Sequence, residues 1–230
     1  MKSWVIKLVT IILLVPISSS TYSQELYGII NDPDGYTNVR KGPGINYEII
    51  TRVLDNEIFY IEESSNDWYL IYLVEQNYTD GYIHASRVRR LSELSTSFQR
   101  TAKSGLVTIK DENTKFNLRR SGFAKSKHEY EFDDNKWIVK IDGKIPYGID
   151  GNYPKTKISR FDFWRNNILV DTPINEFNDL YEVNLGSIKL FRHRDIFFIT
   201  MLNNSDGAGA YDVIWVYQDD TYVKRVVIVP

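Results

Sequence analysis

Short apolar stretches separated by turn-forming residues run through most of this chain. In residues 26–91, and again in residues 106–230, runs rich in Val, Ile, Tyr and Phe alternate with clusters of Gly, Pro, Asn and Asp. This spacing is typical of β-strands joined by tight turns. The best helical candidate is a single turn near residues 176–180, after Pro173. The pattern therefore predicts an all-β protein.

The first 23 residues follow a different pattern. Two lysines and no acid precede an apolar run at residues 8–17, and residues 18–23 are mainly small and polar. This is the organisation of a secretory signal, and the apolar run is shorter than the roughly 20 residues that a membrane-spanning helix needs. We expect cleavage of residues 1–23, which leaves Gln24 first. An uncleaved N-terminal anchor is the alternative.

Residues 24–91 are predicted to form the first folded domain, a small β-barrel. Strands are expected at residues 26–30, twice within 48–63, at 68–74 and at 82–91, with a long loop at 31–47. The Ser- and Thr-rich residues 92–104 are expected to be a linker or a short surface helix.

Residues 105–230 are predicted to form a second, larger domain that is antiparallel and β-rich. Paired turn residues such as Asn166–Asn167 and Asp219–Asp220 favour hairpins. In residues 211–217 both alternating faces are apolar, which predicts a strand covered on both sides, in the middle of a sheet or sandwich. Strands are expected at residues 136–141, 161–164, 168–170, 188–191, 196–201, 211–217 and 222–229, and residues 101–131 have no clear pattern.

Residues 31–44, NDPDGYTNVRKGPG, resemble the signature loop of the bacterial SH3 domain family (SH3b, or SH3 type 3). The matching positions are Gly35, Tyr36, Asn38, Val39, Arg40, Gly42 and Pro43. Downstream, residues 66–69 (NDWY) and 81–83 (GYI) resemble two further elements of the family, in the right order. The resemblance covers about residues 26–91. It departs from the family at Tyr82, where Trp is usual, and in the long loop at 75–80.

The resemblance implies a barrel that binds a ligand in an aromatic groove. Tyr and Trp suit this role because they combine a large apolar area with a polar tip. Within the loop, Pro43–Gly44 is expected to form a type II turn, and Arg40 to pair with Asp32 or Asp34. The candidate ligand-binding residues are Tyr36, Asn38, Arg40, Tyr47, Trp68 and Tyr82.

Composition and charge exclude two classes of partner. The chain is 43% hydrophobic and 14% aromatic, typical of a packed globular protein. Residues 24–91 carry 6 basic and 11 acidic residues, a net charge of −5, and residues 92–230 carry 20 and 19, a net charge of +1. Neither part has the positive excess that nucleic-acid binding requires. No stretch after residue 23 is apolar enough for stable membrane insertion.

The cysteine, histidine and carboxylate content of the sequence gives no catalytic or metal-binding motif. The chain has no cysteine, which excludes a lipidated cysteine, a disulfide and a thiol nucleophile. The three histidines are not at zinc-ligand spacing, and His193 is expected on the surface beside arginines. We predict no catalytic residue, no metal site and no cofactor. The carboxylates that could supply a glycosidase pair lie mostly in turn contexts: Asp133, Asp134, Asp142, Asp150 and Asp162.

These features together predict an exported, non-catalytic binding protein in the periplasm or outside the cell. The resemblance implies that its SH3 domain recognises a peptidoglycan peptide or an envelope protein. One alternative is an envelope immunity or inhibitor protein that binds a secreted toxin or hydrolase. The other alternative is a carboxylate-dependent hydrolase.

Overall fold

The computed structural model describes residues 26–63, 67–94 and 96–229. The secretory signal expected at residues 1–23 lies outside this part of the chain. The described residues form β-strands joined by turns and short 3-10 helices, so the fold is all-β, as predicted. Within these ranges, no helix has the length and apolar character that crossing a bilayer would require.

The first domain is a single antiparallel sheet that curls around its own core. Its strand order is β3-β2-β6-β5-β4-β1-β7. The side chains inside the curl are Ile30, Val39, Val53, Phe59, Ile61, Ile71, Leu73 and Ile83. The elements are β1 (Tyr27–Ile30), β2 (Tyr36–Arg40), β3 (Ile49–Leu54), β4 (Phe59–Glu63), β5 (Trp68–Leu73), η1 (Val74–Gln76), β6 (Thr79–His84), η2 (Ala85–Arg87), β7 (Val88–Arg90) and η3 (Leu91–Glu93).

The loop expected at residues 31–47 contains a strand. β2 forms in the middle of this segment and pairs with β3. Within β2, Val39 points into the barrel core, and its two neighbours lie on the outer side. The type II turn expected at Pro43–Gly44 does not form, since Gly44 lacks the positive φ that this turn needs at its third position. Instead the Gly44 N–H donates to the Gly42 carbonyl at 2.9 Å.

The second domain is a sandwich of two antiparallel sheets with an added hairpin. The five-stranded sheet has the order β14-β13-β10-β9-β8, the four-stranded sheet β15-β16-β17-β18, and β11 pairs with β12. The elements are β8 (Gln99–Lys103), β9 (Leu106–Lys110), β10 (Thr114–Gly122), η4 (Lys125–Lys127), β11 (Tyr130–Phe132), β12 (Ile138–Ile141), β13 (Thr156–Arg165), β14 (Ile168–Val170), η5 (Ile174–Glu176), β15 (Lys189–His193), β16 (Ile196–Asn204), η6 (Gly207–Gly209), β17 (Tyr211–Gln218) and β18 (Thr221–Ile228).

The hairpins of this domain follow the turn residues. Both residues of Asn166–Asn167 and of Asp219–Asp220 have positive φ, the conformation of the tight turns that match strand twist. They join β13 to β14 and β17 to β18, as predicted. β8 forms within the range expected to be a linker, residues 92–104. It is an exposed edge strand with the sequence QRTAK, so it carries no apolar alternation.

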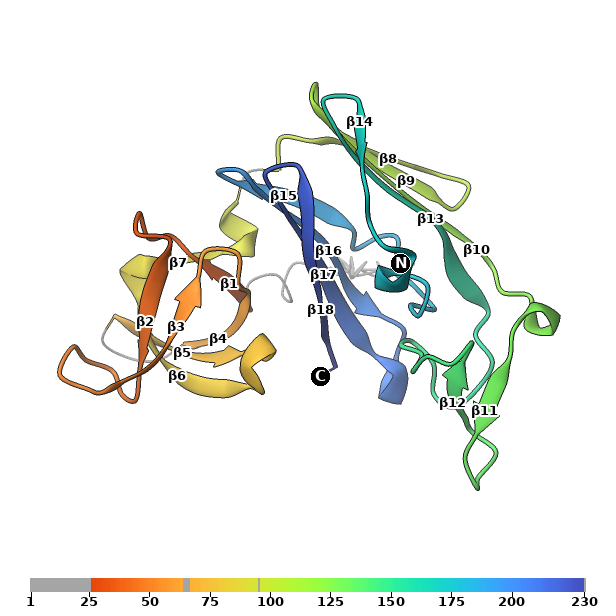
Figure 1. Cartoon of the computed structure of the whole chain (residues 1–230), viewed down its shortest axis with the longest axis horizontal. Helices are drawn as coiled ribbons and strands as arrows, with labels where there is room; N and C mark the ends of the chain where they lie inside the picture. Colours follow the sequence, from red (N-terminus) through yellow and green to blue (C-terminus); the bar gives the residue numbers. More distant parts are fainter. Residues whose placement is uncertain (1–25, 64–66, 95, 230) are drawn as a thin grey trace, which may run out of the picture.

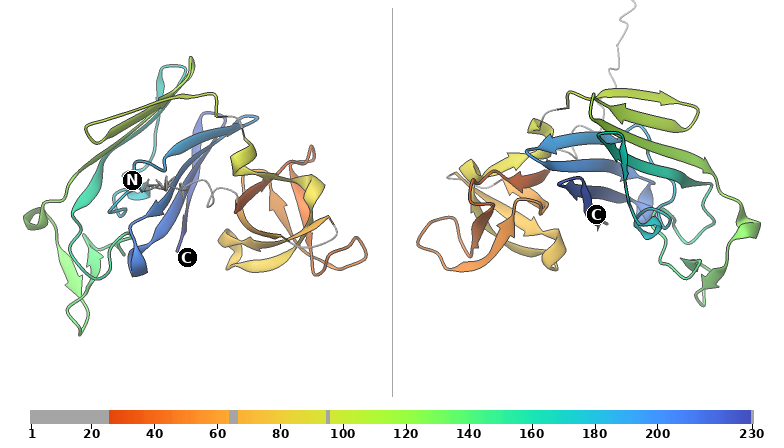
Figure 2. Two further views of the ribbon diagram at one scale, coloured as in Figure 1. Left: turned by 180° about the vertical axis from the view of Figure 1, so that it is seen from behind. Right: turned by 45° about the horizontal axis from the view of Figure 1, so that its top comes forward.

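β17 lies between two apolar layers, as its sequence predicts. One face, with Val213 and Trp215, packs in the core between the two sheets of the sandwich. The other face, with Ile214 and Val216, packs against the SH3-like barrel, together with Phe198 of β16. Figures 1 and 2 show the resulting order of barrel, four-stranded sheet and five-stranded sheet. The barrel therefore completes the burial of the four-stranded sheet.

The junction between barrel and sheet is a continuous apolar contact. From the barrel side and the segment after it, the junction receives Tyr27, Ile29, Ile58, Leu91 and Leu94. Polar pairs flank this contact: Lys224 Nζ lies 2.7 Å from Glu75 Oε1, and Asn56 Nδ2 donates to Gln218 Oε1 at 3.3 Å. The two domains are thus packed against each other.

Candidate functional site

The outer side of the barrel brings together most of the residues predicted to bind a ligand. Alternation along β2 places Tyr36, Asn38 and Arg40 opposite to the buried Val39. Tyr82 of β6 pairs with Arg40 in register, so its side chain lies on the same face. Arg52 of β3 faces Asn38 and places its guanidinium 4.5 Å from the ring centroid of Tyr36.

The loop between β2 and β3 adds an exposed aromatic side chain. Tyr47 is 50% exposed, and its ring covers Gly42, where a β-carbon would lie only 2.5 Å from ring atoms. Arg40 Nη1 donates to the Tyr47 carbonyl at 2.8 Å. The predicted ion pair of Arg40 with Asp32 or Asp34 is wrong. Asp32 pairs instead with Arg87, whose Nη1 lies 2.9 Å from Asp32 Oδ2, because β1 pairs with β7 and brings the two residues together.

We call this group the β2–β3 face; its members are Tyr36, Asn38, Arg40, Tyr47, Arg52 and Tyr82. It combines aromatic rings with guanidinium groups. The β2–β3 hairpin also carries exposed apolar side chains, among them Ile45 and Leu54. This hairpin lies at the end of the molecule that is remote from the second domain (Figure 1). Trp68, the remaining candidate, is only 9% exposed and meets His84 edge-on at 5.3 Å.

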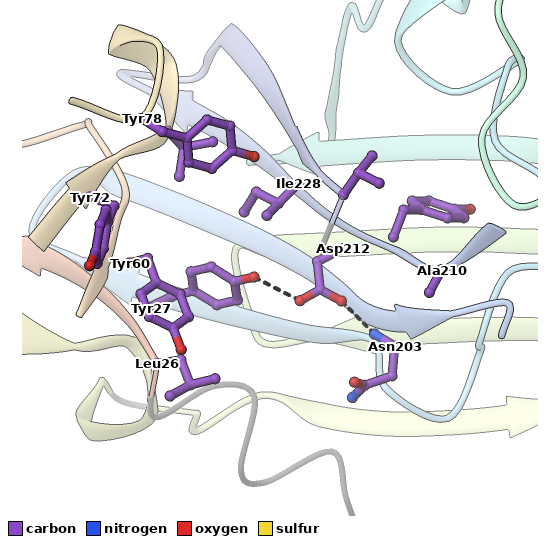
Figure 3. Close-up of a pocket in the computed structure, with 12 residues that line it drawn as sticks. Leu26, Tyr27, Tyr60, Tyr72, Tyr78, Asn203, Ala210, Asp212 and Ile228 are labelled. Carbon is purple, nitrogen blue, oxygen red and sulfur yellow. Dashed lines mark hydrogen bonds between the residues drawn. The ribbon is translucent and has the colours of Figure 1, made fainter. Parts of the chain in front are cut away.

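A pocket that the sequence does not indicate lies at the junction of the two domains. It has a volume of about 500 Å³. Its barrel side is a wall of tyrosines, and its far side is formed by the beginning of β17 and the end of β18 (Figure 3). The residues that define it are Tyr27, Tyr60, Tyr72, Tyr78, Asp212 and Ile228. We call it the junction pocket.

Asp212 is the charged group of the junction pocket, and two donors hold it. Its Oδ2 accepts the Tyr27 hydroxyl at 2.8 Å and its Oδ1 accepts the Asn203 N–H at 2.6 Å (Figure 3). Burial raises the pKa of Asp212, although both hydrogen bonds oppose this shift. Burial, together with the neighbouring Asp212 carboxylate, also raises the pKa of Tyr27.

Stability is expected to depend on pH through Asp212. Because the pKa of this carboxyl is raised from 3.8 in the folded protein, the folded state holds the proton more tightly than the unfolded chain. The stabilisation is fully present below pH 3.8 and is lost as the pH rises through the folded-state pKa. We expect the urea midpoint of the wild type to fall across this window more than that of Asp212→Asn, which does not titrate. Equal pH dependence in the two proteins would contradict this assignment.

The junction pocket escaped prediction because its residues come from distant parts of the chain. Tyr27 and Asp212 are 185 positions apart in sequence, and no local motif links them. The only signal in the sequence is general, the large number of tyrosines, 16 in all.

In the described residues, several of the histidines and carboxylates considered above pair with neighbouring groups of the fold. The expected surface position of His193 is wrong: this side chain is buried, and burial lowers its pKa. His128 Nδ1 lies 2.6 Å from Asp142 Oδ2, while Asp133 accepts N–H groups of its own turn and Asp162 pairs with Arg160. Over the described ranges, no three His, Asp or Glu side chains gather in a way that could hold a metal ion.

One further apolar surface lies on the hairpin of β11 and β12. Trp137 is 60% exposed there, and its ring lies against Gly151. This hairpin projects at the opposite end of the molecule from the barrel (Figure 1). The exposed apolar side chains in this region are Phe132, Trp137, Val139, Ile145 and Tyr153.

Comparison with protein families identifies the first domain. Residues 35–89 match the family model of the bacterial SH3 domain, which is a binding module, and the C-terminal region has no family match. The match contains every candidate residue that the sequence resemblance indicates. Comparisons with curated proteins and with solved structures give no match.

Proposed function

We propose that this protein is exported and binds a cell-wall peptide through the β2–β3 face, without a catalytic step of its own. On this proposal it acts in the periplasm or outside the cell, and the second domain is a rigid platform for the barrel. The match to the bacterial SH3 domain supports a binding role, because this domain is a binding module. It supports a cell-wall ligand, because such modules are often related to the cell wall.

One observation carries the proposal. The barrel buries its β1 side against the second domain. β2 and β3 lie at the far end of the molecule (Figure 1), where Tyr47 of the β2–β3 face is 50% exposed. Aromatic rings and guanidinium groups on that face offer stacking area and several hydrogen-bond donors, which suit the backbone carbonyls and carboxylates of a peptide. The net charge of −5 over residues 24–91 makes a polyanionic ligand a poor fit.

The proposal predicts that purified peptidoglycan retains the full-length chain and that Tyr47→Ala loses most of this retention. Removal of an exposed aromatic anchor typically costs about tenfold or more in affinity. Leu169→Ala is the matched control, because Leu169 is also 50% exposed but lies on β14 of the second domain. Cell fractionation with N-terminal sequencing tests export, and a chain that begins at Gln24 is expected.

Retention that is unchanged in Tyr47→Ala and in Tyr82→Ala would contradict the role of the β2–β3 face. Failure of peptidoglycan to retain the wild type would contradict the proposed ligand. That result would favour the alternative of a protein partner, such as a secreted toxin or hydrolase, for which the exposed apolar side chains around Trp137 are the available surface.

A further inference from the structure

The lining of the junction pocket is aromatic and carries one charge. Tyr27, Tyr60 and Tyr72 form a chain of edge-to-face rings, with centroids 6.2 Å and 6.1 Å apart. Asp212 is the only charged side chain among the described residues that line the pocket. The volume of about 500 Å³ lies within the range of small-molecule sites, roughly 300–1,000 Å³.

Among the described residues, the carboxylate of Asp212 has hydrogen-bond donors but no basic partner. Asp212 is only 6% exposed, and its partners are the Tyr27 hydroxyl and the Asn203 N–H. No basic side chain in the described part of the chain forms an ion pair with it. A carboxylate oxygen has two acceptor directions, so each Asp212 oxygen can accept one more hydrogen bond. A buried carboxylate without a cation is costly, and a cationic ligand would remove this cost.

Tyr78 lies at the rim of the pocket and has a backbone conformation that is unusual for an aromatic residue. It has a φ of 54°, next to Asn77 with a φ of 55°, in the turn that leads into β6. Glycine adopts a positive φ without steric cost, whereas an aromatic residue in this conformation is strained. Tyr78 nevertheless lines the pocket, and the residue is 50% exposed. The strain points to a role for the side chain itself.

We propose that the junction pocket binds an organic ammonium group on an apolar stem. The ammonium donates a hydrogen bond to Asp212, and the stem lies against the tyrosine rings, whose faces attract cations. The net charge of −5 on residues 24–91 favours the approach of such a ligand. The same chemistry occurs in a free amine and in a lysine side chain of a peptide. The proposal does not depend on cell-wall binding by the β2–β3 face.

The test compares ligands of one shape and different charge on the full-length protein. Isothermal titration measures 2-phenylethylammonium against neutral 2-phenylethanol, and the ammonium is expected to bind about tenfold more tightly or better. Asp212→Asn should reduce ammonium binding about tenfold and leave alcohol binding unchanged. A capped Ala-Lys-Ala peptide distinguishes the sources: tighter binding than the free amine identifies a chain-borne ammonium, and weaker binding identifies a small amine.

Two further variants separate a binding defect from a folding defect. Tyr78→Gly relieves the positive φ, so its stability should be unchanged or higher while its affinity for 2-phenylethylammonium falls severalfold. Tyr47→Ala, on the β2–β3 face, should bind the ammonium as the wild type does. The proposal is overturned if the ammonium does not bind saturably, if the alcohol binds equally well, or if Tyr78→Gly has no effect.

Discussion

Phe198→Ala is expected to lower the free energy of unfolding by about 3–5 kcal/mol, the usual cost of removing a buried phenylalanine ring. Phe198 is fully buried on the face of β16 that packs against the SH3 domain. The variant should therefore weaken the attachment of the two domains. Differential scanning calorimetry is expected to give one transition for the wild type and two for Phe198→Ala, with the SH3 domain unfolding first.

Phe197→Ala is the matched control for this experiment. Phe197 is the preceding residue and equally buried, but it points into the sandwich core, where its ring centroid lies 5.6 Å from that of Phe163. Its loss should destabilise by a similar amount while leaving a single transition at lower temperature. If the two variants give the same thermogram, the junction does not couple the domains.

The isolated SH3 domain, residues 26–94, is expected to lose most of its stability. Separation exposes five large side chains that the junction buries: Tyr27, Ile29, Ile58, Leu91 and Leu94. Burial of one such side chain contributes roughly 1.5–3 kcal/mol, and a domain of fewer than about 80 residues rarely has more than 3–5 kcal/mol from its core. In urea titrations followed by circular dichroism, the fragment should unfold at far lower urea than the full-length protein, or self-associate.

A complementation experiment gives the control. Residues 96–229 expose the other half of the junction, so a mixture of the two fragments should recover the cooperative transition. The same mixture made with Phe198→Ala should recover it poorly. A fragment 26–94 that is monomeric and as resistant to urea as the full-length protein would contradict a stabilising junction. Binding tests of the SH3 domain should accordingly use the full-length chain.

The sequence predicted only those residues of the candidate site that lie close together along the chain. The order of Tyr36, Asn38 and Arg40 within one short segment identifies the SH3 loop, and strand alternation then places them on one face. β2 itself was missed because Gly, Pro and Asp surround it, and a turn-rich composition hides a five-residue strand. β8 was missed because an exposed edge strand needs no apolar alternation.

Local patterns along the chain were sufficient for the all-β class, the SH3 resemblance and the main hairpins. The same is true of the double burial of β17, because its two apolar faces are visible in alternate residues. What covers each face depended on three-dimensional packing: the SH3 domain occupies one side and the five-stranded sheet the other. The junction pocket also arises from that packing, since Tyr27 and Asp212 meet only when the barrel docks on the sheet. Contacts between residues so distant in sequence cannot be predicted from hydrophobic periodicity or turn residues, because these patterns reflect only the structure within one strand or turn.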